Sequence, residues 1–171
     1  MELTQQQKDA IIADIEATPE LKAIKDGTNP YDAAVAIADW YNQLAAPDFF
    51  VWKSVLDEHT VYGQTSDDAT TWSWTAYIGR SVAERDAWRQ MFNSIHSINP
   101  SLPQVRAGIT DIFSGTGAAA VAQRAHINSL MRRKAMRIEK LLATGQGTVA
   151  NVATAPDGPI SQGDIVPLIG G

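Results

Sequence analysis

Apolar residues along the chain recur at the three-and-four spacing of helices that bury one face. The pattern predicts helices over residues 5–16, 31–45 and 82–98, another that follows Ser101 and ends before Ser114, and a short one that begins at Pro19. Residues 49–58 are also predicted to be helical. A stripe that includes Val121, Ile127 and Ile138 predicts one long final helix over residues 118–143. The chain is therefore predicted to be all-α, with one helical-bundle domain of about six or seven helices.

Capping residues mark where several of these helices begin. Thr4 precedes the first helix, and Thr18 and Asn29 each stand before a proline that suits a first helical position. Two pairs fit the capping-box pattern, Ser81 with Glu84 and Ser101 with Gln104. We expect a helix to begin within two residues of Ser81 and of Ser101.

Residues 60–80 have the least regular pattern. Residues 63–71 are rich in Ser, Thr and Asp, which predicts a loop. Trp72, Trp74, Tyr77 and Ile78 fit a short helix or the edge of a β hairpin equally well. Most of the chain's aromatic residues are expected in the core. Trp72 and Trp74 are the candidates for anchors in a subunit interface, because tryptophan brings a large apolar area to such contacts.

The last part of the chain is rich in glycine and proline and has no basic residue after Lys140. This composition predicts a helical domain over residues 1–143 and an extended C-terminal arm over residues 144–171. The apolar residues of the arm are candidates for docking on a partner: Ile160, Ile165, Val166, Leu168 and Ile169. We expect the arm to be disordered in the isolated protein, and its deletion to leave the domain folded.

Charge is distributed unevenly along the chain, whose net charge is −5. Residues 1–79 hold 4 basic and 13 acidic side chains, whereas residues 80–140 hold 10 basic and 4 acidic ones. Two interpretations remain open. The two charged faces can neutralise each other partly when the helices pack, or an acidic flank of one copy can meet a basic flank of its neighbour.

The basic residues gather in the predicted last helix, between residues 124 and 140. They are Arg124, Arg132, Arg133, Lys134, Arg137 and Lys140. Such a helix can present a solvated face, contact nucleic-acid phosphates in a groove or a ring lumen, or form a protein interface. Base-specific recognition is not expected, because the helix-turn-helix and zinc patterns are both missing.

The sequence offers little catalytic chemistry. It has no cysteine, and its three histidines, His59, His96 and His126, fit no metal-binding spacing. Gly115 and Gly117 lack the strand, lysine and third glycine of a phosphate-binding loop. We therefore predict no enzymatic activity, no metal and no cofactor. No apolar run has the length of a membrane span, which predicts a soluble protein made inside the cell.

Four segments resemble small proteins from the virion structural modules of tailed bacteriophages. They are AIADWYN (36–42), FVWK (50–53), VRAGI (105–109) and RIEKLLATGQGT (137–148). A helical protein of this size with a terminal arm is similar to the head-tail adaptor, also called the head completion or connector protein. The resemblance implies a homo-oligomeric ring, usually of twelve copies, beneath the portal, which joins the capsid to the tail.

The same resemblance implies the partners and the location. The partners would be the portal protein and tail or neck proteins, with transient non-specific contact with phage DNA in the lumen, and the arm would dock on the portal or on a neighbouring subunit. The protein would be made in the host cytoplasm and reside in the virion neck, without catalytic residues and without a membrane partner. The alternatives are a nucleic-acid-associated helical module that uses the basic helix 124–140, and a small enzyme with unrecognised carboxylates.

Overall fold

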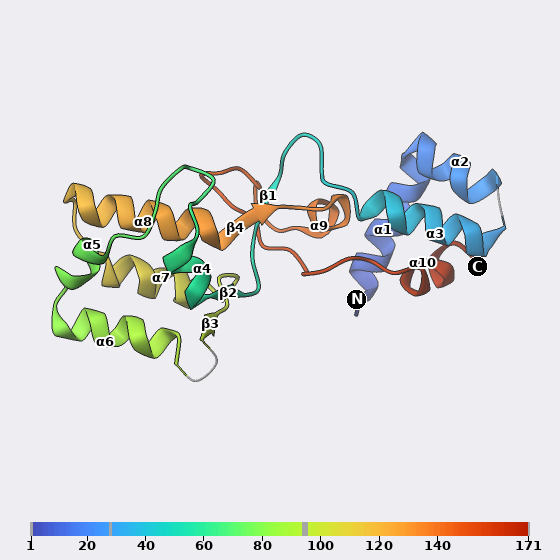
Figure 1. The fold of residues 1–171 in the computed structure, drawn as a ribbon. Helices are drawn as coiled ribbons and strands as arrows, with labels where there is room; N and C mark the ends of the chain where they lie inside the picture. The colour runs from blue at the N-terminus through green and yellow to red at the C-terminus, as the bar shows by residue number, and fades with distance from the viewer. Residues whose placement is uncertain (1, 28, 94–95, 171) are drawn as a thin grey trace. The chain divides into compact units, whose positions relative to one another are not determined.

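The computed structural model describes residues 2–27, 29–93 and 96–170, and the chain divides into two units (Figure 1). The first unit comprises residues 1–51 and 134–171, and the second comprises residues 52–133. Most of the described chain is helical, which confirms the mainly helical prediction. Short strands are also present, so the fold is not purely α as predicted. The division also differs from the predicted domain over 1–143 with a separate arm.

The first three helices of the first unit begin where the capping residues predicted. Its elements include α1 (Gln5–Ala17), α2 (Pro19–Gly27), α3 (Pro30–Tyr41), α9 (Arg137–Leu142) and α10 (Gln162–Ile169). The Thr4 hydroxyl accepts a hydrogen bond from the Gln7 backbone N–H, and the Gln7 side chain accepts one from the Thr4 N–H. Asn29 caps α3 in a similar way. The helix predicted over 31–45 ends earlier, at Tyr41.

The prediction of an extended C-terminal arm is wrong for residues 162–169, which form α10. This helix packs on α3 and α1, and the buried residues of the resulting core are Ile11, Ile15, Leu21, Ala34, Ile37, Ala38, Tyr41, Ile138, Ile160 and Ile165. Asn42 fixes the approach to α10, because its side-chain amide donates to the Ile160 carbonyl and accepts from the Ile160 N–H, each at 2.9 Å. The apolar residues of the predicted arm thus find their partner within their own unit.

Residues 144–160 are ordered by backbone hydrogen bonds. Thr144 and Thr154 exchange two within the segment, with N···O distances of 2.8 and 3.0 Å. Two more join the segment to Phe50, whose N–H donates to the Gly147 carbonyl and whose carbonyl accepts the Ala153 N–H. Gly147 has a positive φ of 65°, and the Phe49 ring lies directly against its α-carbon. The glycines of this segment were interpreted as evidence against regular structure. Three of them instead allow a positive φ, namely Gly145, Gly147 and Gly158.

The second unit packs its helices around aromatic side chains. Its helices are α4 (Glu58–Gly63), α5 (Trp74–Ile78), α6 (Val82–Met91), α7 (Pro103–Ile112) and α8 (Ala118–Met131). The strands β2 (Leu56–Asp57) and β3 (Ser97–Ile98) pair antiparallel, with Leu56 opposite Ile98. Trp88, Phe92 and Phe113 are buried at the centre of this core. Residues 72 and 73 lie in the loop before α5, and residues 74–78 form this short helix, which is one of the two predicted possibilities.

Three helix predictions are wrong in their extent. Residues 49–58 are mainly extended, with β1 (Phe50–Trp52) and β2, and helix begins only at Glu58. The helix predicted over 82–98 ends at Met91, because Ser97 and Ile98 pair with β2; residues 94–95 lie outside the described chain. The predicted helix 118–143 is divided into α8, β4 (Arg132–Lys134) and α9, because β4 pairs with β1.

Only one of the two predicted capping boxes forms. Ser81 accepts from the Glu84 N–H and Glu84 accepts from the Ser81 N–H at 2.7 Å. At the start of α7, Ser101 instead donates its hydroxyl and its N–H to the Asn99 side chain, and α7 has no side-chain cap. Both helices nevertheless begin within two residues of their serine, as predicted.

Replacing Ser81 with alanine should lower the free energy of unfolding by about 1 kcal/mol, because the α6 cap is lost. Urea unfolding of the full chain measures this cost. Ser101→Ala is the matched control, since the same truncation removes no helix cap there. Equal stability of Ser81→Ala and the unchanged protein would contradict the contribution assigned to the cap.

Candidate interaction surface

Trp74 is the most exposed tryptophan of the described chain, and it lies on α5 in the second unit. Its side chain is 53% exposed, while one face of its ring contacts the core: the Trp74 and Tyr62 ring centroids are 5.0 Å apart. Tyr62 is itself fixed, because its hydroxyl donates to Glu58 and accepts from the Trp88 indole N–H. The Trp74 ring therefore rests on a rigid aromatic base.

Trp72 lies in the core and does not share this exposure. It is only 8% exposed, and its ring stacks on Trp88 with centroids 5.3 Å apart. The predicted pair of interface anchors is thus reduced to Trp74. Trp72 lies just before α5, and its ring also contacts the buried Phe113 ring.

Ile78 extends the exposed surface around Trp74. It lies four residues after Trp74, so the two side chains occupy one face of α5, and it is 63% exposed. We call Trp74 and Ile78 the α5 face. Ser73 fixes the start of the helix, since its hydroxyl accepts from the Ala76 N–H and its N–H donates to the Gln123 side chain. The i, i+4 spacing was the sequence signal that could have added Ile78 to the predicted interface.

The predicted basic helix is wrong, because the six basic residues lie on different elements of two units. In the second unit, Arg124 on α8 donates to the carbonyl oxygens of Phe113 and Gly115 after the end of α7. Arg132 on β4 is 9% exposed and pairs with Asp68 at 2.9 Å. Arg133 is partly buried. Two of these three cations thus hold their own unit together.

The other three basic residues belong to the first unit. Lys134 pairs with Asp48 at 2.8 Å. The Arg137 guanidinium lies over the Trp40 ring, 4.1 Å from its centroid. The Lys140 ammonium donates to the Ala46 carbonyl at 3.4 Å. The described residues therefore do not form the continuous basic stripe expected of a phosphate-binding helix.

The predicted docking residues of the C-terminal arm are largely covered. Ile160 and Ile165 are buried in the core of the first unit, and the others pack partly against it, namely Val166, Leu168 and Ile169. These side chains already have apolar partners within the chain. Their candidate role as a free docking segment is not supported by this placement.

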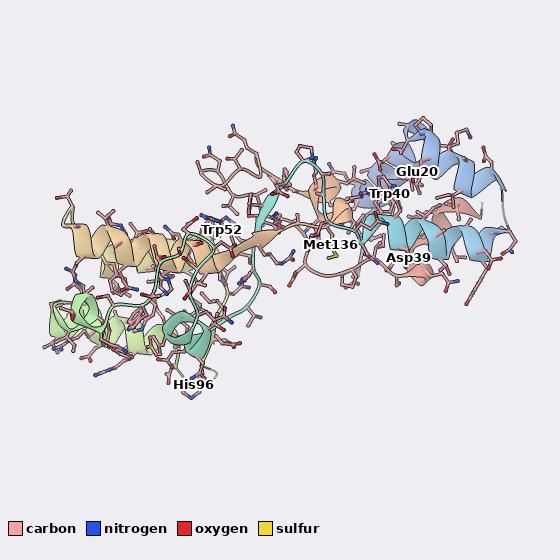
Figure 2. The ribbon with its side chains drawn as sticks, turned by 45° about the horizontal axis from the view of Figure 1, so that its top comes forward. Glu20, Asp39, Trp40, Trp52, His96 and Met136 are labelled. Atoms are coloured by element: carbon pink, nitrogen blue, oxygen red, sulfur yellow. The ribbon has the colours of Figure 1, made fainter. Side chains whose placement is uncertain are left out.

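A pocket of about 340 Å³ lies in the first unit and was not predicted from the sequence. Its wall includes Trp40 and Tyr41 of α3 together with Arg137 and Lys140 of α9. Figure 2 shows Trp40 beside Glu20, whose carboxylate accepts the Trp40 indole N–H at 3.2 Å. The Tyr41 hydroxyl donates to Asp14 at 2.8 Å; burial and this hydrogen bond raise the pKa of Tyr41.

The histidines show no metal-binding arrangement. His126 is fully buried on α8, with Nε2 2.9 Å from the Val61 carbonyl oxygen and Nδ1 3.1 Å from that of Thr70. His59 and His96 are exposed. Within residues 2–27, 29–93 and 96–170, no group of three His, Asp or Glu side chains is placed to hold a metal ion. In the same ranges, no helix has the length and hydrophobicity needed to cross a membrane.

Comparison of the chain with protein-family models, curated proteins and solved structures gave no match.

Proposed function

We propose that this protein is a virion structural protein, a head-tail adaptor that forms a ring of copies beneath the portal and joins the capsid to the tail. The proposal starts from the resemblance of four segments to proteins of phage structural modules. The single observation that carries it further is the exposed α5 face, Trp74 with Ile78, on a rigid aromatic base. Such a face suits a permanent contact with another protein.

The α5 face has the properties of an interface anchor. Burial of a half-exposed tryptophan removes a large apolar area from water, and its ring is already ordered, so little conformational entropy is lost on binding. A ring requires that one surface of each copy contacts a different surface of the next copy. We assign the α5 face to one side of that contact.

The C-terminal residues take a smaller part in this proposal than the sequence suggested. Ile160 and Ile165 are buried, so docking on the portal cannot use them without unfolding α10. The alternative, a nucleic-acid module based on the helix 124–140, loses its main support. That helix is interrupted by β4, and Arg132 is engaged with Asp68.

The double variant Trp74→Ser, Ile78→Ser tests the proposed contact by sedimentation velocity over a range of concentrations. We expect the unchanged protein to associate and the variant to remain a single copy, because the apolar anchors are lost. The matched control is Tyr31→Ser, Val35→Ser, which removes two exposed apolar side chains four residues apart on α3. Association of the α5 variant equal to that of the control would contradict the assignment.

A further inference from the structure

The pocket of the first unit combines two cations with an ordered aromatic wall. The Arg137 guanidinium carbon lies 4.1 Å from the centroid of the Trp40 ring, and the Trp40 indole N–H donates to Glu20. Lys140 stands one turn after Arg137 near the Ala46 carbonyl. The pocket is therefore preorganised, since its planar groups are held by contacts already present in the chain.

The two cations retain the capacity to bind an anion. Within the described residues, Arg137 contacts the Trp40 ring and the Gln43 carbonyl, and Lys140 contacts the Ala46 carbonyl; neither side chain pairs with a carboxylate. Asp14, the acidic residue of the wall, accepts the Tyr41 hydroxyl. The residues that line the pocket, the two cations and Asp14, carry a formal net charge of +1. Glu20 is not among them, and its carboxylate accepts the Trp40 indole N–H.

These features favour a carboxylate over a phosphate. One net positive charge matches a single carboxylate, whereas a phosphate monoester brings about two negative charges near neutral pH. The planar guanidinium fork of Arg137 can contact two oxygens of either anion, so the choice between them rests on charge and on the walls of the pocket. The apolar walls, Trp40, Ala45 and Leu141, suit an aliphatic or aromatic stem better than a hydrated sugar-phosphate backbone.

We propose that this pocket binds one carboxylate on an apolar stem, and that in the assembly the group is an acidic side chain from a second copy of this chain. The choice of partner rests on the proposed function. The chain is suited to be its own partner, because residues 1–79 hold 13 acidic and only 4 basic side chains. The cations of the pocket then meet an acidic side chain from the N-terminal part of a neighbouring copy, and the contact specifies where that neighbour docks.

Binding is tested on the full chain with 3-phenylpropionate as the probe. The readouts are the NMR signals of the Trp40 indole N–H and the Arg137 side chain. We expect saturable shifts with the carboxylate, none with the uncharged 3-phenylpropionamide, and binding at least tenfold weaker in Arg137→Gln, Lys140→Gln. Lys140→Gln alone keeps the Arg137 stacking and should weaken binding less. Lys8→Gln, Lys22→Gln removes two charges elsewhere in the unit and should bind normally.

Equal responses to the amide, stronger binding of inorganic phosphate, or unchanged binding in both pocket variants would overturn the carboxylate site. The choice of partner is measured separately, by sedimentation of the same variants. If the unchanged protein associates and the pocket variants associate equally well, the second-copy assignment fails while the proposed function stands. If the unchanged protein stays a single copy, the proposed function and the second-copy assignment fail, and the probe still decides the site.

Discussion

Deletion of residues 159–171 should unfold the first unit. The deletion removes α10 and with it Ile160 and Ile165, which are buried at 2% and 0% exposure against α1 and α3. It also leaves the Asn42 amide without the two hydrogen bonds to Ile160. Because a unit of this size has little excess stability, loss of a whole packed helix is expected to exceed it.

The smaller variant Ile165→Ala makes this expectation quantitative. Truncation of a fully buried isoleucine should cost about 2–5 kcal/mol of unfolding free energy. Val149→Ala, at an exposed position in the same C-terminal segment, should change it by less than about 0.5 kcal/mol. Amide hydrogen exchange of α1 and α3 gives the readout for the first unit alone. If the amides of α1 and α3 stayed protected from exchange after the deletion, residues 159–171 would be dispensable for the fold of the first unit, as the predicted separate arm requires.

Gly147→Ala should destabilise the first unit by about 2–4 kcal/mol, for two reasons. Gly147 has a φ of 65°, in the region that favours glycine, and an added Cβ would lie 2.1 Å from Cε2 of Phe49. The Phe49 ring would have to leave its place beside Val51 and Ala153. Urea unfolding measures the cost.

Gly158→Ala separates the two causes. Gly158 also has a positive φ, of 101°, but an added Cβ there meets no atom within 4 Å. We expect this control to show only the backbone part of the effect, about 1–2 kcal/mol. If Gly147→Ala and Gly158→Ala lowered the free energy of unfolding equally, the contact with Phe49 would not contribute to the cost of Gly147→Ala.

The sequence predicted helix starts better than helix ends. Thr4, Asn29 and Ser81 are local signals, and each stands at the start of a helix. The break in the predicted helix 118–143 was missed because its apolar stripe continues through it. The backbone becomes a strand there through pairing with β1, which is distant in sequence. Pairing of this kind leaves no local signal at Arg132 or Arg133.

The candidate surface was predicted only in part. Of the two predicted interface anchors, Trp74 is exposed and stays a candidate, whereas Trp72 belongs to the core. Periodicity does not distinguish two tryptophans two residues apart in a short irregular segment. The pocket was missed, because Trp40 and Arg137 come together only when α3 and α9 pack. The composition of residues 144–171 was misread, because Gly145, Gly147 and Gly158 adopt positive φ before α10, and α10 itself contains Gly163 and Pro167.

Cryo-electron microscopy of the full chain mixed with the portal protein of the same virion tests the proposed function most directly. The expected result is a closed ring of copies on the portal, with Trp74 and Ile78 buried between neighbouring copies, and loss of the ring in the Trp74→Ser, Ile78→Ser variant. An unoccupied portal beside a chain that remains a single copy at every concentration would contradict the assignment as a head-tail adaptor.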